Sequence, residues 1–280
     1  MEKNEWIIKP QESFSLDFGS LAKYRELMYF FAWRDIKIRY RDTLLGIFWT
    51  ITQALFLTLV FSVIVSRGFN LPTRGMPPIL FFFSGIIVWN YFSQAVTTSA
   101  NSILIHAQII RKIYFPRLVI PLSSIITASF DFFINAIALI IISLIVKYNN
   151  GIDINILYVI IAIIIAWILT TLVALSAGVF LSALNVKYRD VRNAIPFLVQ
   201  ILFFLTPVMY DFSTNSAGLV SYLLKLNPLV LPIEMIRSNI GSSSFEIAGF
   251  EPLWVVGMVV SLFIALFTFQ KIEHQIADII

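Results

Sequence analysis

The chain has 280 residues, of which 59% are hydrophobic and 13% are charged, and its mean hydropathy is +0.86. About a quarter of the residues in a soluble domain are charged, so this composition excludes an ordinary soluble protein. Cysteine is absent and only two histidines occur, which excludes a disulfide framework, a cysteine nucleophile and an imidazole metal cluster. The sequence therefore predicts an integral membrane protein whose surface faces mainly lipid.

The N-terminal region is too charged to cross a membrane. Its first twenty residues have no apolar core of the kind found in a signal peptide, so we expect this region to be retained. The segment from Ser20 to Asp42 is rich in charged residues as well as in Leu, Phe, Tyr and Trp, which predicts a helix along the cytoplasmic membrane interface. The arrangement of its apolar and basic residues at helical spacing fits either a lipid-surface anchor or a docking surface for a cytoplasmic partner. The expected apolar face comprises Tyr24, Leu27, Met28, Phe31 and Ile38.

Six apolar segments are candidates to span the bilayer, because roughly 20 residues at about 1.5 Å each cover its hydrocarbon core of about 30 Å. They are residues 44–66, 79–98, 118–146, 156–184, 194–210 and 253–269. No repeat or linker divides them. The predicted fold is all-α, with a cytoplasmic N-terminus and interface helix (1–43), a six-helix transmembrane domain (44–270) and a cytoplasmic tail (271–280).

The positions of lysine and arginine predict the orientation. Most of the 20 basic residues lie before the first span, after the second and fourth spans, or near the termini. Short cytoplasmic loops carry such an excess, so both termini are expected in the cytoplasm. Between the fifth and sixth spans, two apolar runs at 219–226 and 229–237 are too short to cross. They are consistent with re-entrant external half-helices packed on protein, or with a plain external loop.

Motifs of known catalytic sites are absent: the chain has no Walker A, zinc-protease or nucleophile-elbow sequence and no clustered carboxylate pair. We therefore expect no enzymatic activity, metal or cofactor in this chain. Asp131, with Asn135 one turn later, is the one obvious acid inside a predicted span. An intramembrane acid is a functional candidate, so Asp131 is either a proton relay or a structural group bonded to a polar neighbour.

Aromatic residues concentrate in the first, second and fifth predicted spans. Aromatic faces can stack on sugar rings and so could line a glycan conduit, but Phe packs well in helix bundles and Trp and Tyr favour membrane interfaces. For any single ring, packing is the simpler interpretation. The candidates for a substrate path are Phe48, Trp49, Phe56, Trp89, Phe92, Phe203, Phe204 and Tyr210.

Several stretches have a characteristic order and spacing. Residues 30–41 read FFAWRDIKIRYR and lead to Phe48 and Trp49; residues 114–123 read YFPRLVIPLS. Residues 185–191 read NVKYRDV, residues 206–210 read TPVMY, and residues 227–237 read NPLVLPIEMIR. In combination they resemble the permeases of type-2 ABC exporters for O-antigen, capsular and teichoic-acid polymers, over nearly the whole chain.

The resemblance implies a homodimer in the bacterial cytoplasmic (inner) membrane, with two copies of a separate ATPase subunit that would hold ATP and Mg. The substrate would be a lipid-linked polysaccharide, and no nucleic-acid partner is expected. Arginine forks match phosphate oxygens, so Arg34, Lys37, Arg39 and Arg41 are candidates for the lipid diphosphate; a positive-inside anchor is the alternative. The expected contacts with the ATPase are His106, Arg111, Lys112, Tyr188, Arg189, Asp190 and Arg192.

The mechanism expected from the resemblance is mechanical. ATP binding would draw the ATPase subunits together, the cytoplasmic helices would transmit that movement, and the first and fifth spans would part to admit the polymer. Two other functions fit the same spans, namely a permease for a small amphiphile such as a drug and a membrane assembly subunit without a transport path. A membrane enzyme is the least supported function, because catalytic motifs are missing.

Overall fold

The computed structural model describes residues 18–41, 43, 46–69, 73–152, 154–211, 226–241 and 251–279. Every regular element within these ranges is a helix, and the protein is an all-α integral membrane protein. In chain order the helices are α1 (Phe18–Lys23), α2 (Arg25–Tyr40), α3 (Ile47–Phe69), α4 (Pro78–Ile105), α5 (Ala107–Ile110), α6 (Val119–Asn150), α7 (Ile156–Lys187), α8 (Val191–Leu205), α10 (Val230–Ile240) and α11 (Glu251–Ile279).

Five of the described helices are long and apolar enough to cross a membrane, namely α3, α4, α6, α7 and α11. The expected fifth span forms α8, whose 15 residues extend about 22 Å, less than the hydrocarbon core of about 30 Å. This helix ends at Leu205 instead of Tyr210 because Thr206 precedes Pro207, which disfavours helical backbone, and is extended. The count of six spans therefore stays a prediction.

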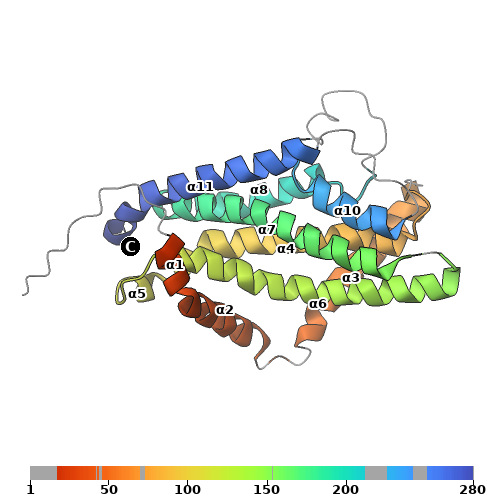
Figure 1. The fold of residues 1–280 in the computed structure, drawn as a ribbon, viewed down its shortest axis with the longest axis horizontal. Coiled ribbons are helices and arrows are strands. Elements are labelled where there is room, and N and C mark those ends of the chain that lie inside the picture. The colour runs from red at the N-terminus through yellow and green to blue at the C-terminus, as the bar shows by residue number, and fades with distance from the viewer. Residues whose placement is uncertain are drawn as a thin grey trace, which may run out of the picture.

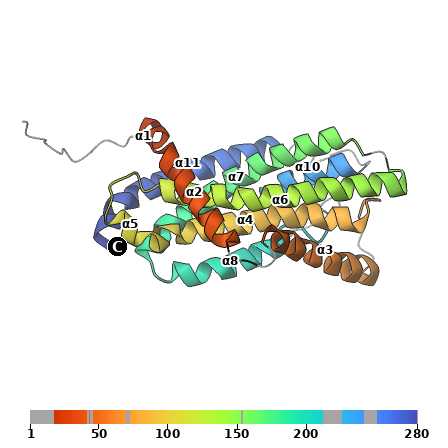
Figure 2. The ribbon, with the colours of Figure 1, turned by 90° about the horizontal axis from the view of Figure 1, so that it is seen from below.

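The bundle is built around α4, which contacts α3, α6, α7, α8 and α10, while α7 also packs against α11 (Figures 1 and 2). Within the apolar window of each helix, 78% of α4 is buried but only 11% of α3. Helix α3 therefore lies at the periphery of the single chain, where its open face must be covered by lipid or by another protein surface.

The predicted interface helix is present but is divided at Tyr24 into α1 and α2. Phe31 is buried against Phe115, Val119 and Ile120, so the apolar face lies on protein at the beginning of α6. Ile38 does not belong to this face, because 67% of it is exposed. The face that contacts α6 passes through Ala32 and Arg39 instead, as their bonds to α6 show, and this leaves Ile38 on the flank.

The second of the two short apolar runs before the last span forms a helix, α10. It is 11 residues long and packs against α7 and α4, in the half of the bundle away from α1 and α5 (Figure 1). Eight of its residues are buried, so this run is a packed half-helix and not a plain loop. The first run lies outside the described residues except for Leu226.

Candidate functional site

The central helix α4 carries a stripe of polar side chains. Between Leu80 and Ile103 every apolar residue of this helix is buried, and the six residues that stay partly accessible are all polar. Their spacing of three or four residues places them on one face of the helix. These residues are Asn90, Ser93, Gln94, Thr97, Thr98 and Asn101.

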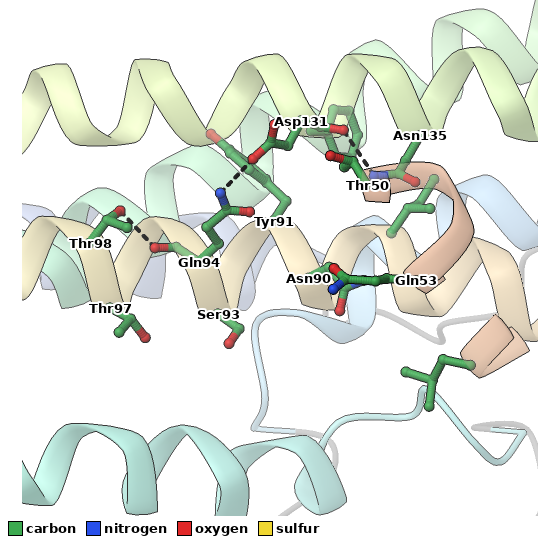
Figure 3. Close-up of a pocket in the computed structure, with 13 residues that line it drawn as sticks. Thr50, Gln53, Asn90, Tyr91, Ser93, Gln94, Thr97, Thr98, Asp131 and Asn135 are labelled. Carbon is green, nitrogen blue, oxygen red and sulfur yellow. Dashed lines mark hydrogen bonds between the residues drawn. The ribbon is translucent and has the colours of Figure 1, made fainter. Parts of the chain in front are cut away.

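Two adjoining cavities follow this stripe, and we call them together the polar groove. A cavity of about 470 Å³ lies between α3, α4 and α6, and a second of about 500 Å³ extends from it to the end of α2. The two share Thr50, Gln53, Gln94 and Asp131. Figure 3 shows Ser93 and Thr97 pointing away from α6, toward the side on which α8 lies.

Several polar side chains of the groove have no hydrogen-bond partner in the protein. Among the described residues, none bonds to the side chains of Gln53, Asn90, Ser93 or Thr97. In hydrocarbon an unsatisfied polar group costs several kcal/mol, so this face cannot be turned toward lipid tails. It requires water, a polar ligand or polar groups of another protein surface, and this need distinguishes the groove from the packed interior.

Asp131 lies where the two cavities meet and is surrounded by three donors. Arg39 and Gln94 donate to its Oδ2 and the Tyr40 hydroxyl donates to its Oδ1. Burial, together with the hydrogen bond to Asp131, raises the pKa of Tyr40 to about 12, so this phenol remains a donor even well above physiological pH. The carboxylate thus joins α2, α4 and α6.

These contacts bear on the two interpretations of Asp131. A carboxylate held by an arginine, a phenol and an amide is a fixed ionic contact, which favours the structural role over a proton relay. Asn135 does not bond to this carboxylate: its Nδ2 donates to the backbone carbonyl of Asp131 at 3.0 Å, and its buried Oδ1 has no partner. The unpartnered oxygen belongs to a residue that lines the groove.

Most of the aromatic residues expected along the substrate path lie outside the polar groove. Trp89 and Phe92 are buried, with ring centroids 5.6 Å apart, and Trp89 lies 5.3 Å from Phe203. These three rings pack among helices. Phe48, Phe56 and Phe204 are exposed on the surface of the single chain, and Tyr210 is half-buried. Of the eight candidates, Trp49 lines one of the two cavities.

The basic residues of α2 differ in their surroundings. Arg34 donates to Asp35 at 2.8 Å and contacts Nε2 of His106, and Arg39 is held by Asp131. Lys37 is exposed and has no partner among the described residues, whereas Arg41 does have an interaction. Binding of a lipid diphosphate by these four residues stays a prediction.

The residues expected to contact the ATPase fall into two environments. His106 is buried at the end of α4, where its Nδ1 lies 2.8 Å from the Ser102 carbonyl oxygen, so it supports the corner between α4 and α5. The other six residues are accessible at one end of the bundle, the end that also carries α1 and the C-terminal end of α11 (Figure 1). They are Arg111, Lys112, Tyr188, Arg189, Asp190 and Arg192.

The opposite end of the bundle holds a buried cluster of charges. Arg74 pairs with Asp211 and, at 2.7 Å, with Glu234, which also pairs with Arg237 at 3.3 Å. Arg237 donates to the carbonyl oxygens of Phe81, Val208 and Tyr210 and lies over the Phe81 ring. The cluster ties α10 to α4 and to the segment that follows α8.

Sequence reasoning missed the polar stripe and the charge cluster. The stripe left a readable signal, because polar residues recur every three or four positions within an otherwise apolar span. The cluster left little signal: Glu234 and Arg237 are one helical turn apart, but Arg74 and Asp211 are distant in the sequence and join them only through the fold.

Comparison with known proteins agrees with this architecture. The profile of the family described as ABC-2 type transporter matches residues 26–240. Two O-antigen export system permease proteins RfbA from Klebsiella pneumoniae are each 26% identical over 249 residues, which cover 88% of this chain and 92% of theirs. The protein of the same name from Myxococcus xanthus is 30% identical over 215 residues, or 75% of this chain and 78% of its own. Since the family profile covers well over half of the sequence, this chain belongs to the ABC-2 type transporter family.

Proposed function

We propose that this chain is the permease subunit of an ABC transporter that exports a lipid-linked, O-antigen-like polysaccharide across the bacterial inner membrane. The family implies an ATPase partner and a membrane location, and the names of its relatives indicate the cargo. The observation that carries the proposal is the polar groove, whose unpartnered amides and hydroxyls match the hydroxyls of a glycan.

A groove of this composition is less suited to a small apolar drug. Such ligands bind in pockets lined mainly by hydrophobic and aromatic side chains, whereas nine of the thirteen residues that line the first cavity carry an amide or a hydroxyl group, and Trp49 is the tryptophan that lines the second. A packing role alone, as in an assembly subunit, would require another protein surface to supply a partner for each of these polar groups.

We propose that the groove is closed by a second copy of the chain. Only 11% of the apolar window of α3 is buried in the single chain. A two-fold dimer that brings α3 and α8 of both copies together would shield the polar face from lipid. Both termini and the six accessible residues of the predicted ATPase contact would face the cytoplasm. There the ATPase subunits would move α2, which Arg39 and Tyr40 connect to the groove.

The proposal is tested by co-purification from the native operon. We expect a stoichiometric ATPase subunit, reduced at least about tenfold when Arg189 and Asp190 are both replaced by alanine, because loss of charge complementarity slows association and removes specificity for the partner. Tyr148→Ala is the control, since Tyr148 is 90% exposed and lies near the C-terminal end of α6, which is at the opposite end of the bundle in Figure 1. Recovery of the permease alone, together with undiminished surface polysaccharide in a deletion strain, would contradict the proposed function.

A further inference from the structure

We infer that the polar groove selects a neutral polysaccharide, with hydroxyl-rich and uncharged repeat units, over an acidic polymer of uronic acids or phosphodiesters. This inference rests on the proposed function and adds the chemical class of the polymer.

The charges of the groove cancel. Among the residues that line its two cavities, Arg39 and Asp131 are the charged ones, and they are paired with each other. The remaining polar lining consists of amides and hydroxyls, which donate as well as accept hydrogen bonds. Sugar hydroxyls have the same dual capacity, so an uncharged repeat unit can satisfy such a lining in many orientations.

Three of the helices beside the groove offer no compensating charge either, and Lys37 of α2, which has no partner among the described residues, is not among the residues that line the two cavities. Helix α4 contains no charged residue over its whole length, α3 has none from Ile47 to Ser66, and α8 has none after Arg192. At the other end, Arg74 and Arg237 are paired with Asp211 and Glu234. Over the stretch covered by these helices, an anionic repeat unit would meet no unpaired cation among the described residues.

An acidic polymer would therefore be penalised at every repeat. Charge is costly in the low-dielectric interior of a membrane, and pores that conduct anions are lined by arginine or lysine. Repeat units occupy the groove one after another, whereas the diphosphate of a carrier lipid would pass once. The selectivity thus acts on the sugar chain and not on the anchor.

The direct test compares two substrates in the purified permease–ATPase complex, reconstituted in inverted vesicles. One is a galactose homopolymer and the other alternates galactose with glucuronic acid, both at similar length on the same carrier lipid. We expect transport into the vesicles and stimulation of ATP hydrolysis to be at least about tenfold lower for the acidic polymer. Equal transport of both polymers, or preference for the acidic one, would overturn the inference and leave the export function standing.

A charge series at Gln53 locates the selectivity in the groove. This side chain is accessible and has no partner among the described residues, so Gln53→Glu and Gln53→Lys change charge at nearly constant size, and Gln53→Met removes the amide without adding charge. The acidic-to-neutral transport ratio, read within each variant, should rise several-fold with lysine, fall with glutamate and change little with methionine. A transport ratio that is the same in the lysine, glutamate and methionine variants would contradict the assignment of the selectivity to the groove. Failure to transport either polymer would refute the proposed function and the inference with it.

Discussion

The ion pair between Arg39 and Asp131 allows a quantitative prediction about how α2 is held. Removal of one partner from a buried pair costs about 3–5 kcal/mol, but the Arg39 side chain is 34% exposed and solvent screening reduces the effect. Tyr40 and Gln94 also remain as donors to the carboxylate. We therefore expect Arg39→Ala to lower the free energy of unfolding by about 2 kcal/mol.

The double-mutant cycle separates the pair from the rest of the site. In the Asp131→Asn background the substitution Arg39→Ala leaves no buried carboxylate unpaired, so it should cost only about 0.5 kcal/mol, which gives a coupling of about 1.5 kcal/mol. The measurement is reversible unfolding in mixed micelles, followed by the fluorescence of the six tryptophans. Lys37→Ala is the control, since Lys37 is exposed. Strictly additive effects of the two substitutions would refute the reasoning.

Two further predictions concern packing. A Cβ atom at Gly85 would lie 3.1 Å from Arg237 Nη2 and 3.1 Å from the backbone Cα of Val208, so Gly85→Ala should destabilise the protein by about 1–3 kcal/mol. A Cβ atom at Gly257 would meet nothing within 4 Å, so Gly257→Ala is the control and should not destabilise the protein. The same unfolding assay measures both variants. Phe31→Ala should lower the free energy of unfolding by about 3 kcal/mol because Phe31 is buried. Phe30→Ala should leave the midpoint of unfolding nearly unchanged because Phe30 is 60% exposed. Similar losses of stability at both positions would contradict the packing of α2.

Hydrophobic composition was sufficient to predict the long helices. The spans that begin at Ile79, Leu118 and Ile156 appear as α4, α6 and α7, within a few residues at their starts and up to seven at their ends, because a membrane helix must be apolar over its own length. The end of a helix was less predictable where a local backbone preference competed with the apolar pattern. At Thr206 the following proline overrode the apolar pattern, and the helix stopped five residues early.

The candidate site was predictable only in part. Asp131 and the region of α2 were recognised, since an acid in an apolar span and a charged helix beside it are visible in the sequence. The partners of Asp131 were not, because Arg39 and Tyr40 are about ninety residues away in the chain and approach it only through the crossing of α2 and α6. Trp89 and Trp49 look alike in sequence, yet one is packed and the other lines the groove.

By itself the sequence determined that the chain is a membrane protein. It also determined the positions of the basic segments and which segments are helical. These properties follow from free energies of transfer and from backbone preferences, which depend on a residue and its near neighbours. Only the tertiary structure decided which side chains face the groove, which charges neutralise each other and which aromatic rings are buried. Those properties depend on contacts between helices distant in sequence, and no local pattern specifies the partner.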